Sequence, residues 1–442
     1  MPLPRISTTL GIGVGTVASL TPGLLPRTPS AQAVLSGLLA VLALGMTVVL
    51  RAALRYWGIA PSQRQERMRL PLMIATAVLV VSAAAYAGHW QNRLRAAMGV
   101  PQIEADYWVR WVIGTALVIG LLIGAVRSIL WVLHTIGGRR GRSTAVVTAL
   151  LLSLIGAPTL TEWRKSVYAS ANAELDPTVV QPVSYAGSGS AGSAVSWSSL
   201  GAEGRKFVSS APARIVPVYI GVNSAPDLDS RVALAIRELE RSGGFTRAHL
   251  VVTIPTGSGW IDATAVAGLD RRFDGDVALV GLQYSYLPSW AAFLFDRDAA
   301  AATARSLFDA VEHHLRSLTH KPKLYLYGQS LGALGGTAVF TDDTEQDRRT
   351  CAVLWAGPPD NRVHRRGATV LANSSDPVLH WSLNLLWRAP DLTGARIDAP
   401  VPPWLPVLGF VQTTADLLAA LDVPRGHGHR YDTDQGTAMA DC

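Results

Sequence analysis

Residues 324–336 have the sequence LYLYGQSLGALGG, in which an apolar run leads directly into the pentapeptide GQSLG at 328–332. The apolar run favours a β-strand, and the residues after Ser330 favour a helix. A serine between two glycines at such a junction predicts a sharp strand-to-helix turn that exposes the hydroxyl group as a nucleophile. An ordinary tight turn that happens to contain a serine accounts for the same five residues. The rest of the chain therefore has to decide between these two interpretations.

Short β-rich segments alternate with amphipathic helical segments around this turn. Helices are expected at 228–241, 297–318 and 331–340. Alternation of this kind predicts an α/β domain with a mostly parallel sheet and helices on both faces. Ser330 would then lie at the carboxyl end of a central strand, where open α/β sheets place their sites. The six expected strands are 214–222, 248–254, 276–284, 323–328, 351–357 and 367–373.

The composition divides the chain into two parts. Of its 442 residues, 49% are hydrophobic and 16% are charged, which is too apolar for an ordinary soluble protein. Residues 1–161 contain 14 Arg, no Lys and 3 acidic residues, whereas residues 162–442 contain 25 Lys and Arg against 29 acidic residues. The basic charge therefore belongs to the apolar part, where arginines that flank helices act as topology signals. Nucleic-acid binding is not expected.

The apolar part predicts a bundle of four or five transmembrane helices. Four segments have about the length that crosses a hydrocarbon core of ~30 Å. A fifth segment, 8–25, contains three closely spaced glycines, and it could span, re-enter or pack against its neighbours. It lacks a small-residue cleavage site, so a removed signal peptide is not expected. The four stronger segments are 32–50, 70–88, 108–126 and 144–160.

The charges of the connecting loops predict the orientation. Loop 51–69 carries five Arg and one Glu, and residues 127–142 carry four Arg and no acidic residue. Loop 89–107 is balanced, with two Arg and two acidic residues. Positively charged loops stay in the cytoplasm, so the first two loops are expected inside and the third outside. Everything after about residue 162 would then face away from the cytoplasm.

Three regions are expected: a transmembrane domain at 1–161, a juxtamembrane segment with a Ser/Gly-rich linker at 162–212, and an extracytoplasmic catalytic domain at 213–442. A dinucleotide-like glycine pattern at 187–192 has no strand before it, and no cofactor is predicted. The two cysteines, Cys351 and Cys442, could form a disulfide in an oxidising compartment or remain free thiols. The sequence leaves the oligomeric state open.

A nucleophilic serine needs a base and a carboxylate that orients the base. Asp376 follows the sixth expected strand in SSDPVLHW, although Asp-Pro also starts ordinary turns. Asp360, one strand earlier, is the second candidate. The string RGHGHRY offers His427 and His429, and the glycines beside them allow a ring to enter a crowded site. We expect His429 to be the base and keep His427 as the alternative.

The remaining part of such a site is a pair of donors for an oxyanion. One donor would be the backbone amide of Leu331, directly after Ser330. The second should come from the loop after an earlier strand, and the glycine-rich string IPTGSGW offers Thr256 or Gly257. That loop could equally be a turn without a catalytic role. The histidine spacing lacks a zinc motif, so no metal site is predicted.

Six strings of the sequence occur together in register: SLTPGLLPR (19–27), PTGSGW (255–260), QYSYLPSW (283–290), GQSLG (328–332), DPVLHW (376–381) and GHGHRY (426–431). Together they resemble a largely uncharacterised family of bacterial membrane-bound α/β-hydrolases with a dedicated N-terminal membrane region. The resemblance implies an α/β-hydrolase domain and supports Ser330, Asp376 and a histidine of GHGH as its catalytic residues. Gln329 and Gly23 depart from the Glu and Ser expected there, and neither change removes one of the three.

The insertion 379–421, which is rich in Trp and Leu, gives the main indication of the substrate. Such a segment suits a lid over acyl chains at a lipid interface, or it simply covers the sheet. The first hypothesis is a serine hydrolase that cleaves acyl esters of membrane lipids or acylated envelope molecules. The second is an acyltransferase of the same fold, and the third is a non-catalytic membrane scaffold. The apolar part has no charged residue deep in a span, which argues against transport.

Overall fold

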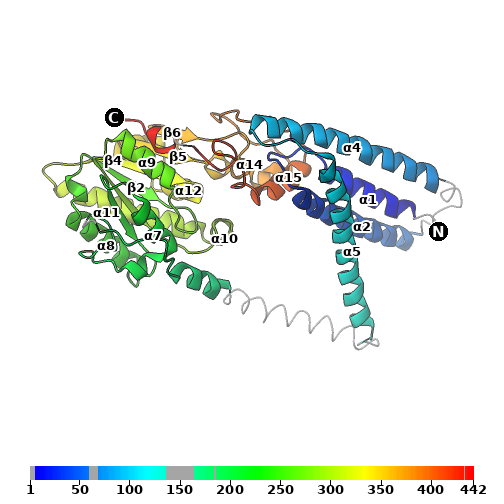
Figure 1. The fold of residues 1–442 in the computed structure, drawn as a ribbon, viewed down its shortest axis with the longest axis horizontal. Coiled ribbons are helices and arrows are strands. Elements are labelled where there is room, and N and C mark those ends of the chain that lie inside the picture. Colours follow the sequence, from blue (N-terminus) through cyan, green and yellow to red (C-terminus); the bar gives the residue numbers. More distant parts are fainter. Residues whose placement is uncertain (1–4, 59–67, 136–163, 184–185, 433) are drawn as a thin grey trace. The chain divides into compact units, whose positions relative to one another are not determined.

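The computed structural model describes residues 5–58, 68–135, 164–183, 186–432 and 434–442. These residues form two compact units. The helical unit comprises residues within 1–157 together with 381–389 and 397–428. The sheet unit comprises residues within 158–380 together with 390–396 and 429–442. Figure 1 gives the labels of the helices and strands.

Among the described residues, three helices of the helical unit are long and apolar enough to cross a membrane, as predicted: α2, α4 and α5. The fourth expected span, 144–160, lies outside the described residues. The uncertain segment 8–25 is helical only over its first part, as the 14-residue helix α1. At a rise of 1.5 Å per residue, α1 is about 21 Å long, which is less than a hydrocarbon core of ~30 Å. The bounds are α1 Ile6–Ser19, α2 Pro29–Tyr56, α4 Arg69–Ala97 and α5 Ala105–Thr135.

The helices of this unit pack through small residues and leave large apolar ones exposed. A Cβ atom on Gly15 of α1 would collide with the backbone of α2 at Leu39 and Ala40. Close backbone approach at small residues is the usual packing of membrane helices. Leu42, Val81 and Leu121 lie on the outside of α2, α4 and α5 and are 61%, 68% and 73% exposed. Such an apolar exterior is compatible with association with a membrane.

Most of the long insertion packs within the helical unit. It contains the 3₁₀ helix η4 (Leu383–Leu386) and α15 (Leu408–Leu417). Asp416 of α15 forms a buried ion pair with Arg27, at 2.8 Å between Oδ1 and Nη2. The insertion also makes apolar contacts in this unit, since its Ala399 shares a buried cluster with Leu24, Leu25 and Trp90, among others. The prediction that this insertion forms a lid remains a prediction.

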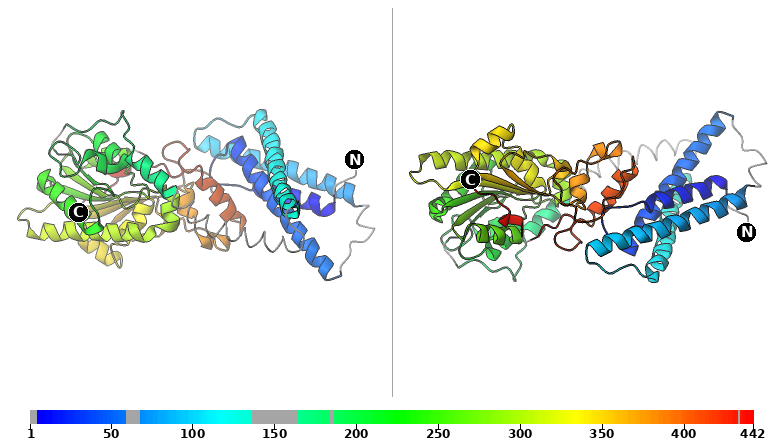
Figure 2. Two further views of the ribbon diagram at one scale, coloured as in Figure 1. Left: turned by 90° about the horizontal axis from the view of Figure 1, so that it is seen from below. Right: turned by 90° about the horizontal axis from the view of Figure 1, so that it is seen from above.

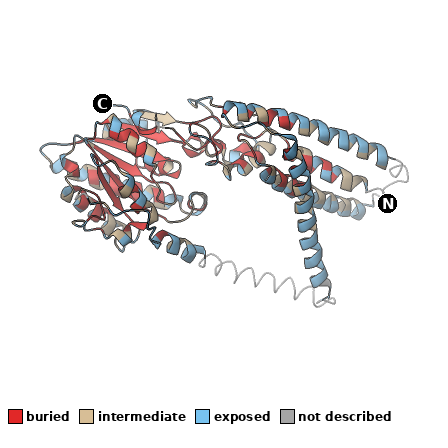
Figure 3. Cartoon of the chain, in the orientation of Figure 1, coloured by how far each residue is buried: buried red, intermediate tan, exposed pale blue. Residues whose placement is uncertain are grey.

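The sheet unit contains six parallel strands in the order β1-β3-β2-β4-β5-β6. All six strands were expected from the sequence, and β4 is in the middle of the sheet. Nearly every residue of the first five strands is buried, because helices cover both faces of the sheet (Figures 2 and 3). Their bounds are β1 Val216–Ile220, β2 His249–Ile254, β3 Val277–Leu282, β4 Lys323–Gln329, β5 Ala352–Ala356 and β6 Ala368–Leu371.

The predicted helices α8, α11 and α12 are present and pack in a row, α8 against α11 and α11 against α12. The apolar residues of α8 and α11 recur with helical spacing, so one stripe of each of these two helices is buried, whereas nearly all of the short helix α12 is buried. The fold is therefore an α/β-hydrolase-type sheet domain that follows an apolar helical region. The bounds are α7 Gly201–Ser210, α8 Leu228–Arg241, α9 Ala263–Arg272, α10 Ser289–Phe295, α11 Arg297–Ser317, α12 Leu331–Thr337, α13 Asp343–Arg349, α14 Pro377–His380 and α16 Asp434–Thr437.

The segment expected to be a Ser/Gly-rich linker is packed onto the sheet where the structure describes it. The amide of Ser188 donates to the Pro217 carbonyl, and the Ser188 hydroxyl accepts from the Tyr219 amide, both at 3.1 Å. These bonds cover the outer edge of β1, whose other edge pairs with β3. Ser188 is fully buried. Small side chains here permit close packing on β1, so the composition typical of a linker was misleading.

Cys351 and Cys442 form a disulfide with their Cα atoms 5.1 Å apart. The bond ties the C-terminal residue to the start of β5. Of the two alternatives that the sequence left open, the structure has the bridged one. A disulfide is typical of proteins outside the cytoplasm.

Candidate active site

Ser330 occupies the turn between β4 and α12 with an unusual backbone conformation. Its φ is 56° and its ψ is −124°, in a region that a residue with a side chain rarely adopts. The flanking glycines make this turn possible. A Cβ atom on Gly328 would lie 2.5 Å from the Gly332 carbonyl, and one on Gly332 would collide with the Ile254 carbonyl. The two glycines of GQSLG therefore allow the strand, the turn and the helix to approach closely.

The neighbouring strand links Ser330 to His429. The Ser330 amide donates to the Ala356 carbonyl at the end of β5, at 2.8 Å. The next residue, Gly357, has a φ of +57°, and a Cβ atom there would lie 2.6 Å from Cε1 of His429. The His429 ring therefore lies against the backbone of Gly357, and Gly357 directly follows Ala356, whose carbonyl binds the Ser330 amide. A side chain at position 357 would displace the ring.

His429 and Asp376 form a direct buried pair. Nδ1 of His429 lies 2.7 Å from Oδ2 of Asp376, and the two side chains are 9% and 0% exposed. The carboxylate also accepts from the Tyr431 hydroxyl and from the Val378 amide, each at 2.8 Å. An ionised carboxylate only accepts hydrogen bonds, so Nδ1 must carry the proton in this pair. Nε2 of a neutral His429 is then left as an acceptor, which is the state that a general base needs.

The two alternative candidates have other partners. Nδ1 of His427 lies 2.9 Å from Oδ2 of Asp398 in the helical unit. Asp360 lies after β5 with a φ of 55°, and its carboxylate is 3.8 Å from the Arg362 guanidinium. The structure therefore joins Asp376 to His429 and gives His427 and Asp360 different neighbours.

The loop Pro255–Trp260 after β2 lies against the start of α12. Gly332 packs directly on the Ile254 and Pro255 carbonyls. The Thr256 amide donates to the Trp260 carbonyl within this loop, at 3.0 Å, so it is already used. Gly257 is buried against α10, where a Cβ atom would lie 2.6 Å from Cβ of Ala292. Of the two residues predicted to supply the second oxyanion donor, Gly257 with its backbone amide is therefore favoured, because the Thr256 amide already has an acceptor.

The Leu331 amide is at the first position of α12, where backbone N–H groups lack partners within the helix. A helix N-terminus also carries partial positive charge. These two properties favour an anion beside Ser330. An amide from Leu331 and an amide from the loop Pro255–Trp260 are the donors that this region offers.

Sequence reasoning missed Tyr431, which binds the same Asp376 oxygen as His429. A possible signal was the aromatic residue that ends GHGHRY. It also missed the surroundings of Gln329, which is buried beside the nucleophile position. The Gln329 amide oxygen accepts from Tyr327 Oη at 3.2 Å and from Gln435 Nε2 at 3.1 Å. The neutral side-chain amide of Gln329 thus accepts both hydrogen bonds, at the position where the family resemblance implies a Glu.

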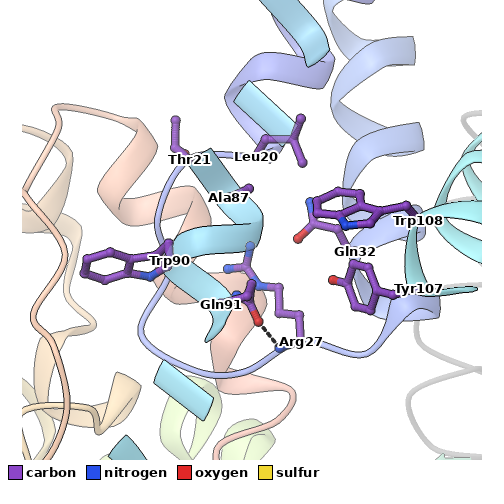
Figure 4. A pocket seen from close by; sticks show the side chains of 9 residues that line it. All are labelled: Leu20, Thr21, Arg27, Gln32, Ala87, Trp90, Gln91, Tyr107 and Trp108. Atoms are coloured by element: carbon purple, nitrogen blue, oxygen red, sulfur yellow. Dashed lines mark hydrogen bonds between the residues drawn. The ribbon is translucent and has the colours of Figure 1, made fainter. Parts of the chain in front are cut away.

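Two further features of the structure resemble binding sites. Among the described residues, the ligand atoms of Cys351, Asp441 and Cys442 are close enough to hold a metal, but the two sulfur atoms are joined in the disulfide. A cavity in the helical unit is lined by Arg27, Gln91 and other residues (Figure 4). It encloses about 10 Å³. This volume holds about one water molecule and excludes an acyl substrate.

Two family models match the chain. One, described as "Alpha/beta-hydrolase family", matches residues 216–370 and 361–441. The other, described as "Alpha/beta-hydrolase family N-terminus", matches residues 20–212. No curated protein and no solved structure matches the chain significantly. The two matched regions correspond to the apolar helical part of the sequence and to the sheet with its Ser330 turn.

Proposed function

Since this chain belongs to the α/β-hydrolase family, we propose that it is a membrane-bound serine hydrolase that cleaves acyl esters through Ser330, His429 and Asp376. Ser330 Oγ attacks the acyl carbonyl while Nε2 of His429 accepts the hydroxyl proton. His429 then returns this proton to the leaving alcohol, which completes the acyl-enzyme. In the second half of the reaction, His429 activates a water molecule that releases the acid and regenerates Ser330.

One observation carries this proposal: Asp376 and His429 are hydrogen-bonded beside the strained turn that bears Ser330. Asp376 holds the ring so that Nε2 remains the acceptor, and its charge stabilises the imidazolium that forms. Gly357 supports this arrangement, because its lack of a side chain leaves room for the ring. An oxyanion formed at the substrate carbonyl would be bound by the amides of Leu331 and Gly257.

A fluorophosphonate probe applied to isolated membranes tests this proposal without knowledge of the substrate. Wild-type protein should become labelled at Ser330, and Ser330→Ala protein should not. His429→Ala should label at least ~10²-fold more slowly, because the hydroxyl is then no longer activated. A wild-type protein that stays unlabelled while its membranes contain other labelled serine hydrolases would leave only the scaffold interpretation.

For the substrate, we propose acyl esters of membrane lipids or of lipidated envelope molecules. The insertion offers apolar contacts, since Leu383, Trp387 and Leu418 are 63%, 63% and 90% exposed. Apolar side chains gain free energy when they leave water, so such a surface favours lipid. Activity should rise with acyl length in detergent or vesicles. A preference for short soluble esters would refute the lipid proposal, and diversion of the acyl product by hydroxyl acceptors would favour the transferase.

For the localisation, we propose a multi-pass protein of the bacterial plasma membrane whose sheet unit faces away from the cytoplasm. Loop charges and the disulfide support this orientation. A C-terminal alkaline phosphatase fusion should be active and a C-terminal green fluorescent fusion should be dark. The opposite pair of results would place the sheet unit in the cytoplasm.

A further inference from the structure

The loop Pro255–Trp260 is held in one shape by bonds to nearly all of its carbonyl groups. Two of these bonds close the loop on itself: the Thr256 amide donates to the Trp260 carbonyl at 3.0 Å, and the Gly259 amide donates to the Thr256 carbonyl at 2.9 Å. Gly259 has a φ of +92°, which permits this tight path. The internal bonds fix the shape of the turn, but they do not fix its position relative to Ser330.

Three side chains, one from β1 and two from the segment after β3, bind three of the four remaining carbonyls of this loop. Tyr219 of β1 donates to the Gly259 carbonyl at 2.7 Å. Gln283 and Tyr284, which follow β3, donate to the carbonyls of Ser258 and Pro255 at 3.1 and 3.2 Å. Burial raises the pKa of the Tyr219 and Tyr284 hydroxyls well above their usual range, so both stay protonated donors.

We propose that Gln283, Tyr284 and Tyr219 are positioning residues that set the loop Pro255–Trp260 at the distance where it can donate to an oxyanion beside Ser330. This inference rests on the proposed hydrolase function and explains part of the string QYSYLPSW. The three donors bind carbonyls on both sides of Gly257, so they fix the peptide group that carries the Gly257 amide. A fixed donor needs no reorganisation during the reaction, and for that reason preorganised amides are effective.

Gln283 is the central member of this set because each end of its amide is bound. Its Oε1 accepts from the Val222 amide at 3.2 Å. Its Nε2 donates to the Ser258 carbonyl and also to Oδ1 of Asn172, at 3.1 Å each. Gln283 is fully buried, and its backbone amide donates to the Ile220 carbonyl of β1 at 2.9 Å. The side chain therefore connects the sheet to the loop.

Asn172 extends this support to the juxtamembrane part of the chain. It lies in the helix at 164–173 and is buried. Arg205, itself buried, donates to the Asn172 carbonyl and to the Glu174 carbonyl, which anchors the end of this helix on the sheet unit. The juxtamembrane helix thus belongs to the support of the oxyanion loop through the bond from Gln283 to Asn172.

The test measures how fast Ser330 reacts with a fluorophosphonate, because the phosphonyl oxygen of this probe occupies the oxyanion site. The experiment uses the full chain in membranes. It measures two quantities, the maximal labelling rate and the probe concentration that gives half of this rate. Gln283→Glu keeps the acceptor for Val222 but replaces the donor to Ser258 and Asn172 with a carboxylate oxygen. We expect its maximal rate to fall by about 10- to 100-fold, with the half-maximal concentration changed by less than about twofold.

Gln346→Glu is the matched control in the same unit. Gln346 is also fully buried and also donates its amide to backbone carbonyls, those of Arg366 and His364. This variant should lose thermal stability to a similar extent while Ser330 reacts at nearly the wild-type rate. Tyr284→Phe, which removes one hydroxyl group, should slow the reaction by about threefold to tenfold and serves if Gln283→Glu does not fold.

The outcomes separate this inference from the function on which it rests. If wild-type Ser330 is not labelled, the hydrolase proposal fails, and the positioning role fails with it. If wild-type Ser330 is labelled but Gln283→Glu and Tyr284→Phe react at the wild-type rate, only the positioning role is refuted. Equal slowing in Gln346→Glu would also refute it, because the effect would then follow from lost stability alone.

Discussion

Replacing Asp416 with Asn should release α15 from the N-terminal helices. In the wild type, Oδ1 of Asp416 accepts from Nε and Nη2 of Arg27 at 2.9 and 2.8 Å, and Oδ2 accepts from the Leu24 amide at 2.7 Å. Burial raises the pKa of the Asp416 carboxyl, and the guanidinium and backbone amides oppose that rise. Asn keeps the shape but turns an N–H group toward donors and leaves the Arg27 charge unpaired.

The expected cost follows from the burial of the pair. Arg27 and Asp416 are only 5% and 1% exposed, so solvent cannot replace the lost partner. Removal of one member of a buried ion pair costs about 3–5 kcal/mol. The double variant Arg27→Met/Asp416→Leu removes both charges, but the Leu24 amide loses its acceptor, and the side-chain and backbone oxygens of Gln412 lose their Arg27 donors. It should cost only about 2–4 kcal/mol, well below the sum of the two single costs.

Hydrogen–deuterium exchange of the detergent-solubilised protein measures this effect locally. The amides of residues 20–28 and 408–417 should exchange about 10²-fold faster or more in Asp416→Asn, since a loss of 3 kcal/mol changes the opening equilibrium by that factor. Asp106→Asn is the control, because Asp106 and its partner Arg110 are exposed. Unchanged exchange in Asp416→Asn, or a double variant as costly as both single variants together, would refute the role assigned to this pair.

Three further predictions concern the candidate active site and the disulfide. His429→Ala should lower ester turnover ~10³-fold or more, and Asp376→Asn should lower it somewhat less. His427→Ala should keep nearly the wild-type turnover. If His427→Ala lost activity and His429→Ala kept it, the choice of base would be wrong. Tyr431→Phe removes one of the donors to Asp376 and should lower turnover by about tenfold without a change in KM; an unchanged kcat would show that this hydroxyl is dispensable. Cys442→Ser opens the disulfide and should lower the free energy of unfolding by about 2–4 kcal/mol, measured by urea unfolding of detergent-solubilised protein, and an unchanged midpoint would contradict this.

The sheet could be predicted because its strands carry strong local signals. Each of the first five strands is a short run rich in Val, Leu or Ile that is buried on both faces, and turn-forming residues bound it. The candidate residues Ser330 and Asp376 follow from the same pattern, since each comes shortly after a strand end. Parallel strands bring such ends to one edge of the sheet, so chain order alone places these residues near each other.

The supports of the candidate site could not be predicted, because they depend on contacts between segments far apart in sequence. Gln283 and Asn172 are 111 positions apart, and nothing in either local string indicates the other. Ser188 presents the same difficulty. Serine and glycine are typical both of a flexible linker and of a segment that packs closely on a strand edge. Only its hydrogen bonds to β1 distinguish these two cases.

The insertion between Asp376 and His429 gives the widest gap between sequence and structure. Asp416 of this insertion pairs with Arg27, which lies 389 positions earlier in the sequence. The composition of the insertion had suggested either a lid over acyl chains or a cover for the sheet. The chain leaves the sheet unit after His380, re-enters it only at 390–396, contributes α15 to the helical unit, and returns at His429. Gly428, directly before the base, has a φ of +53° and packs against Val423. His429, the residue proposed as the base, is therefore covalently joined to a segment that is anchored in the helical unit. We expect that loss of this anchor changes the position of His429 through the connecting chain.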